Sequence, residues 1–230
     1  MTLTQQHGGL GFATGSSPST TTGAKIFFTN SGTEANEGAL KIARKVGKDR
    51  WAAATGGKPD DPGCPKTRIV CFHNSFHGRS MGALSVTSTE KYQAPFRPLI
   101  PNIDVATYND FGCLTELISD DTCAVIVEPV QGEGGVTAAD EAWLRALRKR
   151  CDETGAVLIY DEIQVGWSGH LSTCLLVTSL SSVACLELGL SGRTPHLLST
   201  VILIWSRWQS LWQTGILSVL CCCVTRLLPR

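Results

Sequence analysis

Neither sign of charge is in excess in this sequence, which has 20 basic and 20 acidic side chains among 230 residues. Proteins that bind nucleic acid or an anionic membrane through electrostatics carry a basic excess, so we expect neither partner. Long hydrophobic runs are also lacking. The longest, at 197–205 and 216–224, fall short of the roughly 20 apolar residues that a membrane-spanning helix needs. We therefore expect a protein that acts on small molecules.

Paired metal-binding cysteine motifs are absent as well. The ten cysteines are irregularly spaced and include no Cys-x-x-Cys pair, so we expect no metal site and no disulfide framework, and a reducing compartment. Residues 1–23 are polar and contain no arginine, so they resemble neither a secretory signal nor a transit peptide.

Lysine disappears from the last third of the chain. The last one is Lys149, and the residues after position 166 include a single acidic residue but four of the six tryptophans and five of the ten cysteines. The surface of a soluble protein is richer in charge than this. We expect residues 1–24 to be a flexible remnant of an N-terminal segment, residues 25–166 to form a ligand-binding domain, and residues 167–230 to be a poorly ordered tail.

Apolar runs alternate with helix-like patterns over residues 25–164. Short apolar runs predict strands at 25–29, 68–72, 103–107, 123–129 and 156–160. Helices are expected at 32–46 and at 139–154, the second ending at Gly155. This alternation predicts an α/β fold with a mostly parallel sheet and flanking helices, in which ligands bind beyond the carboxyl ends of the strands.

A small polar turn at 29–33, Thr-Asn-Ser-Gly-Thr, leads from the first strand into the first helix. Unpaired amides at a helix N-terminus, together with serine and threonine hydroxyls, form a ready site for a phosphate group. The alternative is that Ser31 or Thr33 merely caps the helix, with Glu34 or Glu37 in support.

The second strand leads into Phe76-His77-Gly78-Arg79. An aromatic ring, a glycine that permits close approach and a guanidinium together offer a stacking surface beside a carboxylate clamp. The alternative is that Phe76 belongs to the core, Arg79 is a surface charge and His77 is structural.

Carboxylates stand at the ends of the fourth and fifth strands. The fourth runs into a glycine-rich loop that carries Glu128 and Glu133, and the fifth ends at Asp161. A carboxylate at the tip of an apolar strand is costly to bury unless a cation meets it. A protonated pyridine nitrogen is such a cation.

In this order, four segments resemble the class-III aminotransferases of fold type I, which use pyridoxal 5'-phosphate. They are Phe-Thr-Asn-Ser-Gly-Thr-Glu-Ala-Asn at 28–36, Phe-His-Gly-Arg at 76–79, Glu-Pro-Val-Gln-Gly-Glu-Gly at 128–134 and Asp-Glu-Ile-Gln at 161–164. Four motifs in register leave little room for coincidence. The Phe-His-Gly-Arg form, followed by Ser-Met-Gly-Ala-Leu-Ser, is most similar to the acetylornithine aminotransferases, and ornithine and 4-aminobutyrate aminotransferases are the alternatives. The resemblance makes residues 25–166 the cofactor-binding portion of the large domain.

The resemblance also implies which residues bind the cofactor. These would be Ser31, Gly32, Thr33, Phe76, Asp161, Ile163 and Gln164. The turn residues would hold the phosphate, Phe76 and Ile163 would pack on the two faces of the ring, and Gln164 would bind its phenolic oxygen. Asp161, the expected catalytic residue, would keep the ring nitrogen protonated and so make the ring an electron sink.

Substrates, assembly and location follow from the same resemblance. Arg79 would bind a substrate carboxylate, and Glu133 would help to select between the amino donor, N-acetylornithine, and the acceptor, 2-oxoglutarate. Because family members are homodimers and this branch of arginine biosynthesis is mitochondrial, we expect a homodimer in the mitochondrial matrix, or a cytoplasmic protein if no targeting segment exists.

One residue that the family requires is missing. Members carry a lysine downstream of the Asp-Glu-x-Gln motif that forms a Schiff base with the cofactor, and no lysine follows Lys149. We back-translated residues 202–220 with free choice of synonymous codons and read the result two nucleotides on. One permitted reading is Pro-Asp-Met-Val-Thr-Val-Ala-Lys-Pro-Leu-Ala-Asn-Gly-Tyr-Pro-Ile-Gly-Ala. That reading resembles the family's lysine-bearing segment, and its lysine codon straddles Gln209 and Ser210.

We therefore expect the residues from Trp167 onward to be the product of a frameshift or a retained intron, and the N-terminal segment of the domain to be absent. On this hypothesis apolar surface of the sheet near 156–160 is left exposed or poorly covered, and the chain is an inactive aminotransferase fragment. The rival hypothesis is a non-catalytic polypeptide that binds the cofactor weakly or does not fold.

Overall fold

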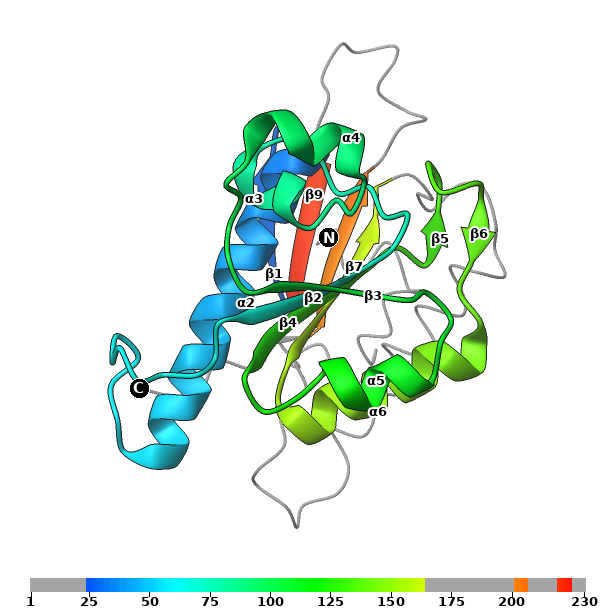
Figure 1. Ribbon diagram of the computed structural model, residues 1–230. Coiled ribbons are helices and arrows are strands. Elements are labelled where there is room, and N and C mark those ends of the chain that lie inside the picture. Colours follow the sequence, from blue (N-terminus) through cyan, green and yellow to red (C-terminus); the bar gives the residue numbers. More distant parts are fainter. Residues whose placement is uncertain (1–23, 164–200, 207–218, 225–230) are drawn as a thin grey trace, which may run out of the picture.

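The computed structural model describes residues 24–163, 201–206 and 219–224. A seven-stranded sheet runs through its centre, in the order β1-β9-β8-β7-β4-β2-β3 (Figure 1). Its strands are β1 (Ala24–Thr29), β2 (Arg68–Phe72), β3 (Ile103–Ala106), β4 (Thr122–Val127), β7 (Val157–Glu162), β8 (Val201–Ser206) and β9 (Val219–Val224). A separate two-stranded hairpin joins β5 (Val130–Gln131) to β6 (Thr137–Ala138).

The sheet is mostly parallel. Strands β3, β2, β4, β7 and β8 pair in parallel, whereas β9 pairs antiparallel to β8 on one side and to β1 on the other. All six residues of β4 are buried, as expected of a central strand covered on both faces. The carboxyl ends of β2, β4 and β7 therefore meet at one edge of the sheet.

One face of the sheet is covered by the long helix α2 (Gly32–Thr55). Its small buried residues Ala35, Ala39 and Ala43 pack against alternate residues of β2, β4 and β7. Alanines at this spacing let the helix axis approach the sheet closely, which brings the first turn of α2 to the strand ends.

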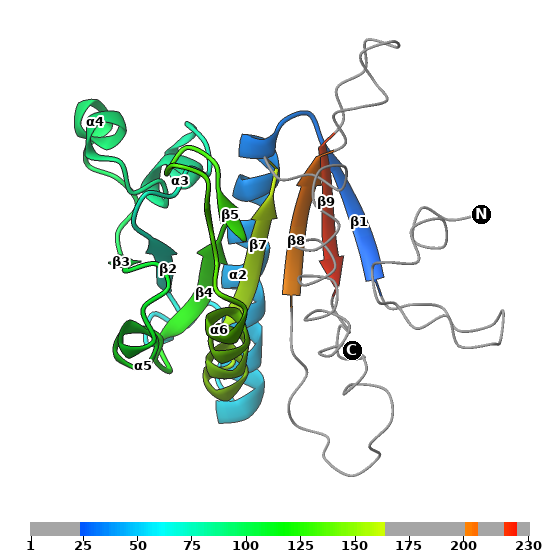
Figure 2. The same ribbon diagram turned by 90° about the vertical axis from the view of Figure 1, so that its right-hand side faces the viewer.

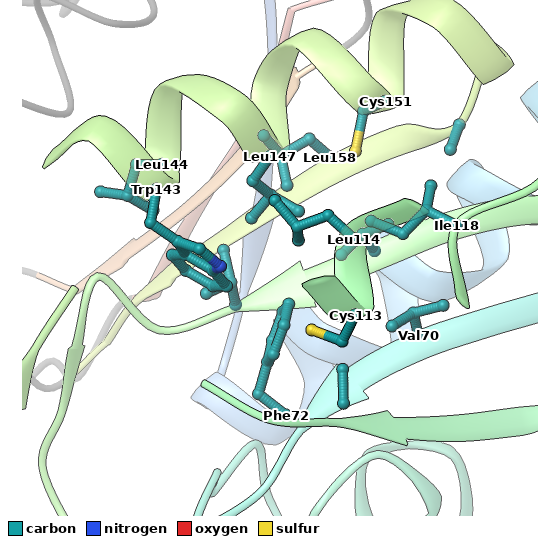
Figure 3. Close-up of a cluster of buried hydrophobic side chains, with 14 of the residues drawn as sticks. Val70, Phe72, Cys113, Leu114, Ile118, Trp143, Leu144, Leu147, Cys151 and Leu158 are labelled. Carbon is teal, nitrogen blue, oxygen red and sulfur yellow. The ribbon is translucent and has the colours of Figure 1, made fainter. Parts of the chain in front are cut away.

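The other face is covered by α5 (Gly112–Leu117) and α6 (Glu141–Thr154), as Figure 3 shows. Helix α6 begins where the Asp140 carboxylate accepts a hydrogen bond of 2.9 Å from the Trp143 amide. The Trp143 ring packs edge-on against Phe72, with 5.1 Å between ring centroids. With Leu147 and Cys151, also fully buried, it forms one apolar stripe along α6.

Short helices connect these layers. They are α3 (Met81–Ser85), α4 (Glu90–Gln93) and the 3-10 turn η1 (Ala94–Phe96). Within the described ranges, no helix is both long and apolar enough to cross a bilayer, and no cluster of His, Cys, Asp and Glu could hold a metal ion.

The predicted α/β class and the five predicted strands are confirmed, with bounds that differ by at most two residues at either end. The predicted left-handed cap at Gly155 is also confirmed, with φ of 71°. The first helix is longer than predicted and continues to Thr55, because the polar second half of α2 lacks the apolar periodicity on which the prediction depended.

Two strands of the sheet, β8 and β9, lie within residues 167–230, and Figure 2 shows them between β7 and β1. Surface near 156–160 was expected to be exposed or poorly covered, but Val157 to Tyr160 are at most 1% exposed, because α2 and α6 cover the two faces of β7. The rest of the tail and residues 1–23 lie outside the described residues.

The core on the α6 face should dominate the stability of this domain. Replacing the fully buried Leu147 by alanine should lower the free energy of unfolding by about 2–5 kcal/mol, since the cavity left behind forfeits packing. Lys149→Ala, on the same helix with a side chain 79% exposed, should change it by less than about 0.5 kcal/mol. Urea unfolding followed by circular dichroism measures both, and equal effects would contradict this packing.

Candidate active site

A cavity of about 180 Å³ opens at the edge of the sheet where β7 ends, beside the first turn of α2 and the loop that follows β2. Its lining comes from these three elements. The residues are Ser31, Gly32, Thr33, Phe76, His77, Gly78, Asp161 and Ile163. The polar turn, the Phe-His-Gly-Arg segment and the end of the fifth predicted strand, far apart in sequence, thus meet around one space.

The floor of the cavity includes the N-terminus of α2. The Ser31 hydroxyl accepts a hydrogen bond of 3.2 Å from the Glu34 amide, so the capping alternative is correct for this residue. The Glu34 carboxylate turns away and accepts from the Asn30 amide at 2.7 Å. The amides of Gly32 and Thr33 have no acceptor within the helix, and the Ser31 hydroxyl can still donate its own proton. Capping and anion binding are therefore compatible here.

Two glycines make the cavity possible. A Cβ at Gly32 would lie 2.5 Å from Cδ1 of Ile163, and a Cβ at Gly78 would collide with Oγ1 of Thr33. Gly78 also has φ of 132°, which side chains rarely adopt. Any larger residue at either position would push the walls into the space between the α2 turn and the end of β7.

Asp161 is the charged centre of the cavity. It is 4% exposed, and its Oδ2 accepts from Asn36 Nδ2 at 2.9 Å and lies 2.8 Å from Nδ1 of His77. Its Oδ1 accepts from the Ile163 amide at 3.1 Å. In the part of the chain that the structure describes, no arginine or lysine pairs with Asp161. The neighbours hold this carboxylate in place but include no permanently charged cation.

Asn36 and His77, which contact Asp161, make further hydrogen bonds of their own. Asn36 Nδ2 also donates to the His77 carbonyl at 2.6 Å, and the His77 amide donates to the Thr87 hydroxyl at 2.9 Å. Two polar atoms of this network, Oδ1 of Asn36 and Nε2 of His77, are buried without a partner among the described residues. Unpartnered buried polar atoms are uncommon and mark a site that a ligand or water can complete.

Glu128 lies behind the cavity, 3% exposed. Its Oε2 accepts from the Phe76 amide at 2.9 Å, which fixes the loop that carries the ring. Burial raises the pKa of Glu128 to about 7, and the negative charge of Asp161 acts in the same direction against the opposing effect of His77.

Arg79 and Glu133 lie outside the cavity lining but next to it. The Arg79 guanidinium carbon is 3.6 Å from the centroid of the Tyr92 ring and 5.8 Å from that of Phe76. The Tyr92 hydroxyl donates a short hydrogen bond to Oε1 of Glu133. These side chains thus form one surface that continues from Phe76.

The structure brings together eight of the nine residues that the sequence singles out: six in the cavity lining and Arg79 with Glu133 beside it. The ninth, Gln164, lies outside the described residues. Sequence reasoning missed Asn36 and Tyr92, and it assigned no role to Glu128. Asn36 could have been suspected, since it stands one helical turn after the Ser-Gly-Thr turn at 31–33.

Comparison with known proteins identifies the family of the chain. The family "Aminotransferase class-III" matches residues 13–174, which is more than half of the chain. The chain belongs to the class-III aminotransferases. Members of this family depend on pyridoxal phosphate, so the cofactor expected from the motifs is the family's cofactor.

Two relatives with curated names are mitochondrial acetylornithine aminotransferases. The chain is 54% identical over 143 residues to the mitochondrial acetylornithine aminotransferase of Neurospora crassa, a match that covers 62% of this chain and 29% of the relative. It is 57% identical over 142 residues to the Yarrowia lipolytica enzyme of the same name, covering 62% and 31%. The chain therefore spans about a third of the length of these relatives.

Among solved structures, ornithine aminotransferase from Toxoplasma gondii, described with partial occupancy of PLP at its active site, superposes with a TM-score of 0.60 and 27% identity. The match covers 86% of this chain and 40% of that one. The class-III aminotransferase fold is therefore preserved over most of the chain.

The cavity of this class-III aminotransferase chain fits pyridoxal phosphate. The turn at the start of α2 offers free amides to a phosphate, the Phe76 side chain offers an aromatic face, and the buried Asp161 carboxylate offers a partner to a protonated ring nitrogen. The two glycines leave the room that a planar ring requires.

The raised pKa of Glu128 makes stability depend on pH. The pKa of Glu128 rises from 4.5 in the unfolded chain to about 7 in the folded chain. Its contribution to the free energy of unfolding is therefore fully present below pH 4.5 and is lost as the pH rises through 7. Between these values the free energy of unfolding of the wild type should fall relative to that of Glu128→Gln, by at most about 3 kcal/mol. Urea titrations across this range test the effect.

The exposed Glu116 provides the matched control, since Glu116→Gln removes an equal charge from the surface. Its difference from the wild type should stay within about 0.5 kcal/mol at every pH. A pH-independent difference between Glu128→Gln and the wild type would show that the Glu128 carboxyl is not perturbed.

Proposed function

We propose that this chain is the cofactor-binding part of an acetylornithine aminotransferase, an enzyme that transfers an amino group from N-acetylornithine to 2-oxoglutarate in arginine biosynthesis. The observation that carries the proposal is Asp161, a buried carboxylate that Asn36 and His77 hold in a cavity that fits the cofactor and that no lysine or arginine of the described residues pairs with. The identities above 50% to enzymes of this name support the substrate.

The cavity residues divide the binding of the cofactor between them. The Gly32 and Thr33 amides, with the Ser31 hydroxyl, bind the phosphate. Phe76 and Ile163 pack on the two faces of the ring, and Gln164 hydrogen-bonds its phenolic oxygen. Pyridoxal phosphate, when bound, supplies an electron sink for the carbon that loses its proton.

Asp161 keeps the ring nitrogen protonated, because an ionised carboxylate within hydrogen-bond reach favours the charged form of its partner. With Nδ1 protonated, His77 donates to Oδ2 of Asp161, and Asn36 donates to the same atom. These two donors orient the carboxylate while leaving the net negative charge to meet the ring.

Substrate selection falls to the surface beside the ring. Arg79 binds a substrate carboxylate through its guanidinium donors, and Glu133 offsets that charge when the amino donor is bound. Ornithine or 4-aminobutyrate is the second candidate donor, favoured by the structural similarity to ornithine aminotransferase, but at 27% identity this is weaker than the similarity to acetylornithine enzymes.

The chain as it stands lacks the Schiff-base lysine, and we propose that it does not transaminate. The support is the alternative frame of residues 202–220, in which the codons of Gln209 and Ser210 can encode a lysine within a segment that resembles the family's.

The assembly and location of the intact enzyme are proposals from its relatives. Their names place them in mitochondria, so the matrix is the proposed location, with the homodimer of the family as the proposed assembly. Small amino and oxo acids are the proposed partners, without nucleic acid, metal or membrane.

Cofactor binding by the 230-residue chain tests the role of Asp161. The isosteric change Asp161→Asn should weaken binding of pyridoxal phosphate at least about tenfold in isothermal titration calorimetry, because it removes a charge-assisted hydrogen bond. Asp60→Asn, a change of equal charge at an exposed position, should leave the affinity unchanged. Equal affinities of the two variants would contradict the assignment of Asp161.

Restoration of the reading frame tests the activity. A chain with the frame restored after Gln164, preceded by the N-terminal residues of a relative, should absorb visible light with pyridoxal phosphate, lose that band on borohydride reduction, and prefer N-acetylornithine to ornithine and 4-aminobutyrate. The 230-residue chain should show neither band nor turnover. Transamination by the 230-residue chain would disprove both the frameshift and the assignment of the lysine.

A further inference from the structure

Arg79 is exposed, and its surroundings are unusual for a surface arginine. Among the described residues no ion pair or hydrogen bond of its guanidinium is found; the guanidinium carbon lies over the Tyr92 ring at 3.6 Å from the centroid, with the Phe76 ring next at 5.8 Å. Stacking on aromatic faces leaves the five N–H donors in the guanidinium plane free to point outward. Such a guanidinium is prepared to bind a carboxylate from solution.

A carboxylate of the protein is nevertheless close by. Glu133 contacts the same tyrosine that supports Arg79, because the Tyr92 hydroxyl donates to its Oε1. An exposed glutamate that has no other partner is attracted to a nearby unpaired arginine and competes with any carboxylate that binds from solution. The hydroxyl gives Glu133 a different partner.

The position of Tyr92 does not depend on these two charges. Its neighbour Gln93 donates through Nε2 to three carbonyls, those of Leu84, Ser85 and Thr87, at 3.1, 3.4 and 2.9 Å. These bonds fasten α4 to the C-terminal end of α3. The Tyr92 ring is thus presented from a fixed element, with Phe76 edge-on to it at 6.2 Å between centroids.

We infer that Tyr92 is a positioning residue that keeps the carboxylate-binding subsite of Arg79 open: its ring carries the guanidinium, and its hydroxyl holds Glu133 off it. The inference rests on the proposed role of Arg79 in binding a substrate carboxylate. It adds Tyr92 as a determinant of how strongly the site binds a dicarboxylate acceptor relative to a donor that lacks a second carboxylate.

The test uses the 230-residue chain with pyridoxal phosphate present and glutarate, a five-carbon dicarboxylate, as the probe. The Nε–Hε signal of Arg79, assigned by its absence in Arg79→Gln, reports both the ring above it and the bound carboxylate. In the wild type this signal should be displaced by the ring current of Tyr92 and should shift further with glutarate.

Two substitutions separate the ring from the hydroxyl. Tyr92→Phe should keep the ring-current displacement but weaken glutarate binding about threefold to fivefold, since the released Glu133 pairs with Arg79. Tyr92→Leu should lose the displacement as well and weaken binding about tenfold.

A double variant tests whether it is the released Glu133 that weakens glutarate binding. Glu133→Gln in the Tyr92→Phe background should restore glutarate affinity to that of Glu133→Gln alone, because no carboxylate then competes for Arg79. Glu90→Gln, which removes a charge from the same helix as Tyr92, should not restore it. A Tyr92→Phe variant that binds as the wild type does, or one that Glu133→Gln fails to rescue, overturns the inference.

The proposed function can fail separately. If isothermal titration calorimetry, which needs no Arg79 signal, shows that Arg79→Gln binds glutarate as tightly as the wild type, Arg79 does not bind the carboxylate, and the assignment on which the inference rests is wrong. If Arg79→Gln weakens binding while both Tyr92 variants leave it unchanged, only the role of Tyr92 is wrong.

Discussion

The buried carboxylate of Asp161 is the constraint on which the site depends. An ionised group at the end of an apolar strand is unfavourable unless its hydrogen bonds and its charge are both met. The hydrogen bonds come from Asn36 on α2 and His77 on the loop after β2, so satisfying one side chain ties three separate elements together. The charge is not met by a fixed cation of the described chain, and the proposal that the cavity binds a cationic ring rests on that imbalance.

The parallel sheet supplies the geometry that this constraint needs. Because β2, β4 and β7 run in the same direction, the Phe76 loop, the Glu128 loop and Asp161 all emerge at one edge. Glu128 then reaches the Phe76 amide, and Gly78 lets that loop approach the α2 turn. The order of strands thus converts motifs separated by dozens of residues into neighbours.

Patterns local in sequence predicted the strands, both long helices and the Gly155 cap, since periodicity and capping act over a few residues. Tyr92 was not predictable in this way. Its importance comes from Arg79 and Glu133, which lie 13 and 41 residues away in the sequence, and from Gln93 fixing α4. The raised pKa of Glu128 likewise depends on burial that no single segment reveals.

Strands β8 and β9 of the tail show that the fold and the chemistry place different demands on the sequence. Backbone pairing needs only a short apolar run with good strand propensity, and Val-Ile-Leu-Ile in β8 and Val-Leu-Cys-Cys in β9 meet that need. They cover the edge of β7 and complete the sheet up to β1. The Schiff-base lysine is different, because only an amine can do its work. On the frameshift hypothesis, a sequence that selection did not shape can therefore still extend the sheet, while the one residue that transamination cannot do without is lost.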